Sequence, residues 1–327
     1  MMIRRRGKGE KAQAGFGLIE IMVALGLGAI ILLGVAEIFT NNSRTRAETE
    51  RTSRQIESGA YALRVLESEI ASAGFWGEAD EQPVDISTLP PLCPTTDTQI
   101  IAAMGYPVQG QNGPGVSCIT PKAGTDFIAI RRANSCALDP VTCPAPNPDF
   151  AFYMQMNACF VPDDLTVDLP GTMYIEATPA DLDTGTELDC ATPAPVYGLH
   201  SRIYFVNADD QLVRMALTAD TTNPYQETIL VDGVETMRLE YGIDTTGDGQ
   251  VDIQALPTTP AEWSNVAMVR ASLVIRNLES TGGYLDDRTY DIAGSTYSVP
   301  AAFQDHKRQV YSRTISMRNI AGRRELP

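Results

Sequence analysis

The longest apolar stretch of the chain lies near its N-terminus and reads FGLIEIMVALGLGAIILLGVAEIF over residues 16–39. As a helix with about 1.5 Å of rise per residue it would span roughly 36 Å, which is enough to cross a bilayer. Two acidic residues, Glu20 and Glu37, interrupt it. Glu37 lies near the end of the stretch, where a tilted helix lets the carboxylate reach the headgroups. The pattern predicts a transmembrane half-helix over 16–39.

After this stretch the pattern becomes amphipathic. Residues 40–73 contain no proline and one glycine, and charged residues occupy much of the segment. Apolar residues recur at helical spacing along one face, namely Ile56, Leu63, Leu66 and Ile70. We therefore expect the helix to continue over 40–75 as a periplasmic half that lies against a globular head and ends near Gly74.

Beyond this helix, proline, glycine, threonine and aspartate separate short apolar runs, which is typical of strands joined by turns. Residues 76–195 form a loop-rich region with few strands, such as TDFIAIRR and FAFYMQMNACF. Residues 196–327 alternate apolar and polar positions in HSRIYFV, QLVRMAL, ETILVDG, ETMRLEYGI, VAMVRASLVIRN and RQVYSRTISMRNI. This alternation predicts an antiparallel β-sheet head with one face under the long helix, and hence an α+β fold.

The charge of the chain is divided unequally. Residues 1–15 carry five basic side chains and one acidic one, a net of +4, so the remainder sums to −20 because the whole chain is −16. The basic start is expected to stay cytoplasmic, which places the head outside the inner membrane. Such an acidic body would repel a phosphate backbone, so nucleic acid is not an expected partner.

The six cysteines gather in one region, at Cys93, Cys118, Cys136, Cys143, Cys159 and Cys190. They lack the paired C-x-x-C spacing of zinc sites, and an even, clustered set indicates disulfides in an oxidising compartment. Six cysteines allow fifteen pairings. Sequence order weakly favours the nearest-neighbour set, which pairs 93 with 118, 136 with 143 and 159 with 190.

The residues around the start of the apolar stretch carry a specific motif. Gly15-Phe16-Gly17-Leu18-Ile19-Glu20 follows the basic segment and closely resembles the type IV prepilin signal. The resemblance implies that a prepilin peptidase removes the leader, residues 1–15, after Gly15, and that the new amine of Phe16 is methylated. No small-residue cleavage site follows the apolar core, so we expect the helix to be retained.

Glu20 is unusual because a carboxylate inside a transmembrane helix costs about 2.5 to 3.5 kcal/mol and needs a partner. Its own helix offers none. In assembled pilins, a glutamate at the matching place faces the N-terminal amine of a neighbouring subunit. The resemblance therefore implies that Glu20 stabilises docking into a fibre.

Three segments of the head make the resemblance more specific. The hairpin IYFVNADDQLVRM, the strand ending in EYGID and the closing YSRTISMRN are similar to the PilW family of type IV minor pilins. The family implies an inner-membrane subunit with a periplasmic head that helps to initiate the pilus within a tip or priming complex. Implied partners are the other minor pilins, the major pilin, the assembly platform and a PilY-type tip adhesin. The apolar helix lacks the proline that major pilins commonly carry, which favours a minor subunit.

Two alternatives remain open from the sequence. The N-terminal signal is shared with minor pseudopilins of type II secretion, although their heads are generally smaller. A ligand-binding role, as a surface adhesin or a DNA-uptake pilin, belongs to a different class, and the acidic head disfavours DNA.

A segment of the head, GIDTTGDGQVDIQAL, matches part of a calcium-binding loop. Oxygen-bearing residues occupy the ligand positions in the order Asp244, Thr246, Asp248, Gln250 and Asp252. The twelfth position holds Ala255 where an EF-hand has glutamate, so closure would need another carboxylate such as Glu262. The other interpretation is a hairpin whose Asp and Gly residues serve the turn. Ca²⁺ is therefore a candidate ligand here.

Catalytic chemistry has little support in the sequence. The two histidines, His200 and His306, are far apart, and neither a Gly-x-Ser-x-Gly elbow nor a phosphate-binding glycine loop occurs. We interpret His200 as a strand-edge residue and His306 as a solvated loop residue. The acidic pairs 163–164 and 286–287 lie in turn-like contexts that favour aspartate anyway. We expect no enzyme.

Overall fold

The computed structural model describes residues 15, 17–77, 87–112, 118–138, 143, 150–159 and 171–320. The chain divides into two compact units, Met1–Thr52 and Ser53–Pro327. The helix α1, Leu18–Ala71, contributes its first part to the first unit and its last part to the second. Its C-terminus lies close to the predicted end at Gly74.

The first part of α1 is an apolar rod. Its large side chains, from Leu18 to Phe39, are exposed, and no part of its most hydrophobic window is buried. Among the described residues, α1 is the one helix long and apolar enough to cross a membrane. Its polar continuation adds local hydrogen bonds, such as those from Thr45 Oγ1 to the Asn41 carbonyl and from Thr49 Oγ1 to the Thr45 carbonyl, both 2.9 Å long.

The second part of α1 buries a narrow face made of Gln55, Gly59, Ala62, Leu66, Glu69 and Ile70. The predicted face was wrong at Ile56, whose side chain is 48% exposed. The reason is that the helix turns the small residue Gly59 toward the sheet, and Ile56 is then left on the exposed side. The ring of Tyr311 lies over Gly59 so closely that a Cβ there would be 2.3 Å from a ring carbon. Gln55 occupies the buried position that apolar periodicity assigned to its neighbour.

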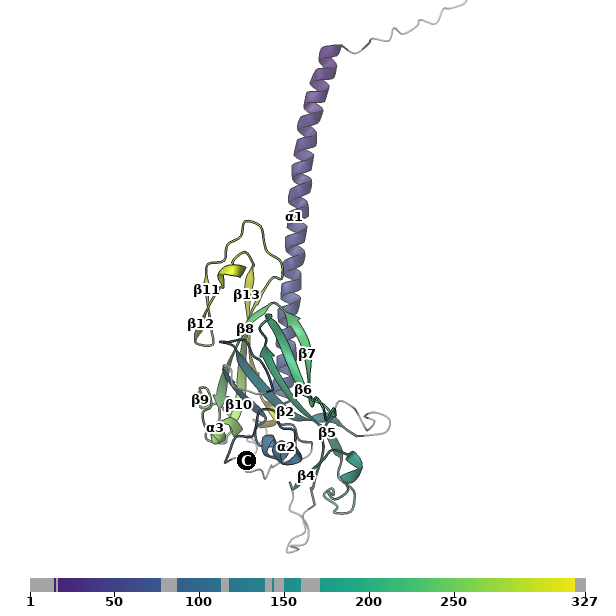
Figure 1. Cartoon of the computed structure of the whole chain (residues 1–327), viewed down its shortest axis with the longest axis vertical. Helices are drawn as coiled ribbons and strands as arrows, with labels where there is room; N and C mark the ends of the chain where they lie inside the picture. Colours follow the sequence, from purple (N-terminus) through teal and green to yellow (C-terminus); the bar gives the residue numbers. More distant parts are fainter. Residues whose placement is uncertain are drawn as a thin grey trace, which may run out of the picture. The chain divides into compact units, whose positions relative to one another are not determined.

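Two antiparallel sheets form the head, where the sequence indicated one (Figure 1). The larger sheet runs in the order β1 (Val108–Asn112), β2 (Asp126–Ala137), β5 (Val196–Val206), β3 (Tyr153–Met156) and β4 (Met173–Glu176). β6 (Gln211–Leu217) pairs with β5, and β7 (Tyr225–Asp232) pairs with β6.

The smaller sheet runs in the order β13 (Arg308–Ser316), β10 (Val266–Arg276), β8 (Val234–Ile243) and β9 (Ile253–Gln254). The hairpin of β11 (Thr289–Ile292) and β12 (Ser295–Ser298) stands apart from both sheets. The chain passes from one sheet to the other at Gly233, between β7 and β8. Its φ of 79° lies in the left-handed region that favours glycine. β7 therefore belongs to the larger sheet and β8 to the smaller one, although the two strands are consecutive in the sequence.

The main core lies where α1 meets the two sheets. Leu66 and Ile70 from α1 pack with Ile128 and Ile130 from β2 and with Val269 from β10. Two short helices, α2 (Asp97–Met104) and α3 (Pro260–Ser264), were not expected from the sequence. Each begins after a threonine whose hydroxyl accepts a backbone N–H, as N-cap residues do.

Three disulfides join Cys93 to Cys118, Cys136 to Cys143 and Cys159 to Cys190, which is the nearest-neighbour set. They all lie in the loop-rich part of the sequence. The sequence boundary at residue 195 does not separate two sheets, because β2 on one side of it pairs with β5 on the other. The predicted α+β class, with a long N-terminal helix, an antiparallel head and disulfides, is confirmed.

Candidate functional site

The processing motif lies at the start of the described chain. Gly15 is exposed, Phe16 lies outside the described residues, and Glu20 lies in the first turn of α1 with its side chain exposed. Within the described residues, the Glu20 carboxylate makes no hydrogen bond or ion pair. The role assigned to Glu20 by the resemblance therefore stays a prediction.

The Asp-rich loop connects β8 to β9, so its flanks are strands as expected. Asp244 is buried, and its Oδ1 and Oδ2 accept backbone N–H groups of Gly247 and Gly249 at 2.7 and 3.0 Å. The Asp252 carboxylate accepts hydrogen bonds from the hydroxyl and backbone of Thr245, and these hold the pKa of Asp252 below its usual value. Asp248 accepts the backbone N–H of Gln250 at 2.9 Å. The loop thus closes on its own side chains.

Glu262 does not complete this loop. Its carboxylate accepts the backbone N–H groups of Thr258 and Thr259 at 2.6 and 3.0 Å and caps α3. Nor does the part of the chain that the structure describes hold a group of three or more His, Cys, Asp or Glu residues arranged for a metal ion. Calcium binding at Asp244, Thr246, Asp248, Gln250 and Asp252 stays a prediction.

Both interpretations of the histidines were wrong. His200 lies inside β5, opposite Arg132 of β2, with its ring 4.8 Å from that of Phe150. Burial, followed by the charges of three arginines, lowers the pKa of His200 to about 2, so it stays neutral. His306 is buried beside Phe303. The neighbours of His200 come from distant parts of the sequence, and periodicity does not register such contacts. The neighbour of His306 belongs to the short 3₁₀ helix Ala301–Phe303 just before it, which the sequence analysis did not expect.

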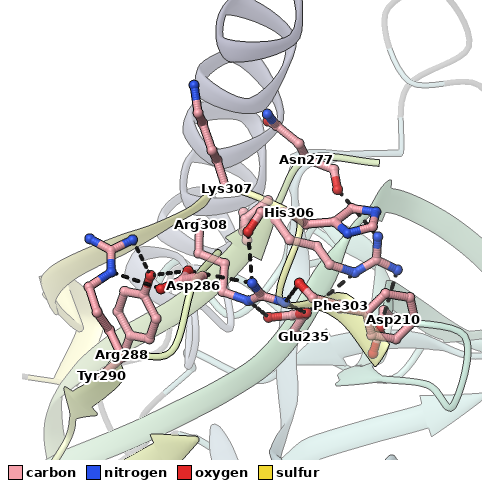
Figure 2. Close-up of polar contacts among 12 residues, drawn as sticks. Asp210, Glu235, Asn277, Asp286, Arg288, Tyr290, Phe303, His306, Lys307 and Arg308 are labelled. Atoms are coloured by element: carbon pink, nitrogen blue, oxygen red, sulfur yellow. Dashed lines mark hydrogen bonds and ion pairs between the residues drawn. The ribbon is translucent and has the colours of Figure 1, made fainter. Parts of the chain in front are cut away.

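A buried charge network is the main polar feature that the sequence did not reveal (Figure 2). Arg308, at the start of β13, donates from Nε to Glu235 Oε2 at 2.6 Å and from Nη2 to Glu235 Oε1 at 2.7 Å. Its Nη1 lies 3.4 Å from Asp286 Oδ2. Asp286 also accepts hydrogen bonds from Arg288 and Tyr290 at 2.8 and 2.7 Å. The network therefore ties the segment that carries β11 and β12 to the smaller sheet.

The network continues toward the turn between β5 and β6. Arg276, the last residue of β10, lies 3.4 Å from Glu235 and 3.3 Å from Asp210, and its guanidinium stacks over the ring of Phe303 at 4.2 Å. Lys122 forms a further ion pair with Asp210. The sequence signal that could have indicated this network is the presence of basic residues at the ends of predicted strands, because strand ends lie close together where two sheets join.

The same region also fastens α1. Gln55 Nε2 donates to the carbonyls of Ile275 and Lys307 at 2.7 and 3.2 Å. Tyr311 returns a hydrogen bond from its hydroxyl to the Gln55 carbonyl at 3.1 Å. Farther along, Glu69 pairs with Arg132 of β2 and Arg202 of β5. Helix and sheets are therefore joined by buried polar contacts as well as by the apolar core.

Comparison with known proteins adds to this picture. Residues 203–319 match the family model of PilW, type IV pilus-assembly protein W, and residues 11–36 match the prokaryotic N-terminal methylation motif. This chain carries a PilW domain and a prokaryotic N-terminal methylation motif. The predicted resemblance is confirmed.

No curated protein sequence matches the chain. Among solved structures it is similar to a type IV-like pilin from Thermus thermophilus, with 11% identity and a TM-score of 0.41. That similarity covers 82% of this chain and 97% of the other. At this TM-score, the assignment rests on the two sequence matches.

The PilW domain begins within β5 and ends just after β13. It therefore contains the smaller sheet and most of the buried charge network, including Asp210, Glu235, Arg276, Asp286 and Arg308. The pilin family and fold are structural rather than catalytic.

Proposed function

We propose that this chain is a minor pilin that helps to initiate type IV pilus assembly. The observation that carries the proposal is the combination of a PilW domain with an N-terminal methylation motif on one exposed apolar helix. In this role the chain waits in the inner membrane with its head in the periplasm. It then enters a tip or priming complex with other minor pilins, the major pilin and a PilY-type adhesin.

The physical basis of entry into the fibre is Glu20. A carboxylate in the apolar part of a helix is costly in lipid, and the cost falls when a neighbouring subunit supplies a positive charge. Prepilin peptidase cleaves this chain at Gly15-Phe16 and exposes a new N-terminal amine. In the fibre, the corresponding amine of a neighbouring subunit supplies the positive charge that faces Glu20. The assembly platform would then extract the subunit from the membrane.

The acidic head supports a protein partner over nucleic acid, because the region outside the leader carries a net charge of −20 within a total of −16. A pseudopilin role in secretion has the same N-terminal motif, but the match to a pilus-assembly family favours the pilus.

Immunogold labelling of sheared fibres tests the proposal. We expect sparse label at fibre ends, at a level far below that of the major pilin. Label spread along the shaft would contradict a tip position, and label confined to the inner membrane in cells with mature pili would contradict incorporation.

A further inference from the structure

Three arginines gather on one face of the larger sheet. Arg202 of β5 lies between two neighbouring strands that bring Arg132 of β2 and Arg214 of β6 to the same side. Register shows this, because Arg132 is opposite His200 and Arg214 is opposite Tyr204, and alternate residues of β5 share a face. The three guanidiniums therefore lie on the face that also receives Glu69 of α1.

The negative charge at this cluster is too small to balance it. Glu69 Oε1 accepts hydrogen bonds from Arg132 at 3.2 Å and from Arg202 at 2.6 Å. Within the described part of the chain, Arg214 makes no ion pair. Three positive charges therefore meet one carboxylate, and His200 is neutral. The cluster keeps two positive charges in a chain whose net charge is −16.

Polar atoms at the cluster also lack hydrogen-bond partners among the described residues. The Tyr204 side chain is fully buried, and its hydroxyl makes no hydrogen bond. The same is true of Glu69 Oε2 and of Nε of Arg132 and Arg214. The Tyr204 hydroxyl and the Nε groups of Arg132 and Arg214 donate hydrogen bonds, and a buried donor without a partner is costly. These donors are therefore short of a ligand that accepts hydrogen bonds.

The cluster is open toward β7. Thr228 and Gln226 lie on the same face, opposite Arg214 and Ala216, and both are exposed. The side chains of Arg132 and Arg202 are only 14% and 18% exposed because α1 covers their side of the sheet. β7 pairs with β6 alone, and its outer edge makes no backbone hydrogen bond to the described residues. An extended polypeptide can therefore approach Arg214 along β7.

We propose that Arg214, with Arg202 and Arg132 behind it, binds a carboxylate of an acidic segment from a neighbouring subunit. Guanidinium groups bind carboxylates through paired charge-assisted hydrogen bonds, and the two unbalanced charges supply the attraction. The open strand edge favours a polypeptide over a lipid headgroup or free phosphate. The proposal rests on the subunit role proposed above only in naming the source of that segment.

A binding measurement on the full mature chain in detergent tests the chemistry alone. The probes are a hexaglutamate peptide and inorganic phosphate, at low salt. We expect Arg214→Gln to weaken peptide binding by about tenfold or more, while Arg270→Gln, an exposed arginine on β10, leaves it unchanged. The proposal would be overturned if Arg214→Gln bound the peptide as tightly as the wild type does. It would also be overturned if the wild type bound phosphate but did not bind the peptide.

A second variant keeps the test independent of folding defects. Thr228→Glu places a carboxylate at an exposed position opposite Arg214, so it should occupy the cluster from within. We expect it to block peptide binding without lowering the melting temperature. Undiminished binding to Thr228→Glu would contradict the assigned position.

Photo-crosslinking in cells identifies the partner. A benzophenone side chain in place of Gln226 should crosslink to an Asp- or Glu-rich peptide of another pilus subunit, as identified by mass spectrometry. Arg214→Glu should abolish this crosslink, and Arg270→Glu should not. A crosslink to lipid or to an acid-free peptide would overturn the docking proposal. If fibres still require the gene while Arg214→Glu keeps the crosslink, the docking site fails and the minor-pilin role stands.

Discussion

Arg308 and Glu235 form a buried, two-point ion pair, with Nε 2.6 Å from Oε2, Nη2 2.7 Å from Oε1, and both side chains fully buried. The pair joins β13 to β8 across β10 at the point where the chain returns from the β11–β12 hairpin. Because buried charges depend on their partners, loss of one member should be more harmful than loss of both.

Removal of one partner is the first prediction. Arg308→Met should lower the free energy of unfolding by about 3–5 kcal/mol, because Glu235 is left buried without its main counterion. Arg308→Met combined with Glu235→Leu should be less destabilised than Arg308→Met alone. Urea unfolding of the three proteins checks the order. A double variant that is no more stable than Arg308→Met would contradict this interpretation of the pair.

The pH dependence of stability provides the second prediction. Burial alone would raise the pKa of Asp286, but hydrogen bonds from Arg288 and Tyr290 outweigh it, so the pKa lies below its usual value. A carboxyl with a lowered pKa stabilises the fold above its unfolded pKa, about 3.9, and loses that contribution as pH falls through the folded pKa.

Asp286→Asn should therefore be less stable than wild type at neutral pH, and the difference should shrink as the pH falls below about 4. Melting temperatures measured across this range check the trend. Asp287→Asn is the matched control, since Asp287 is exposed beside it. A gap between wild type and Asp286→Asn that is constant with pH would contradict the assignment.

The contact between α1 and β13 gives the third prediction. A Cβ at Gly59 would lie 2.3 Å from the Tyr311 ring, so Gly59→Val must displace the ring or the helix. We expect a loss of about 1–3 kcal/mol. Ala60→Val is the control, because Ala60 is exposed on the same helix. Thermal unfolding compares the two, and equal stabilities would show that Tyr311 does not fix the helix there.

Local pattern predicted what depends on local sequence. The apolar helix, the strands of the PilW domain and the flanks of the Asp-rich loop all follow from periodicity within a few residues. The nearest-neighbour disulfides also bridge short separations. Features of this kind need no knowledge of which strands become neighbours.

The missed features depend on contacts between distant segments. Ile56 fits the apolar periodicity of the helix, yet its neighbour Gln55 is the buried residue. The Gln55 side-chain amide donates hydrogen bonds to the carbonyls of Ile275 and Lys307. The sequence around Asp286 is typical of a turn, but in the structure this side chain contacts Arg308 of β13. The division into two sheets likewise depends on Gly233, whose positive φ leaves no periodic signal.

The Asp-rich loop gives the fourth prediction, which follows from the calcium hypothesis. Millimolar calcium should raise the melting temperature of the mature chain in detergent. Asp248→Asn should remove this rise, because the Asp248 carboxylate is exposed, and its Oδ2 is left to bind an ion while Oδ1 accepts the backbone N–H of Gln250. Magnesium serves as the control cation. Calorimetric titration that shows no heat beyond buffer controls would refute the hypothesis.

The fifth prediction concerns Glu20. Its exposed carboxylate on the apolar part of α1 has no role in the head, so Glu20→Ala should leave a stable protein that is still processed at Gly15-Phe16. Assembly should suffer, because the carboxylate no longer pairs with the amine of a neighbour. Immunoblots of membranes give the level and size of the variant, and a loss of processing or of protein would contradict this separation.

Counting surface pili by electron microscopy tests the minor-pilin role most directly. The strains are a gene deletion without another PilW-domain gene, and the deletion complemented with wild type or Glu20→Ala. We predict few or no pili in the deletion, restored numbers with wild type and poor restoration with Glu20→Ala. Wild-type numbers of pili in the deletion strain would contradict a role in initiating assembly.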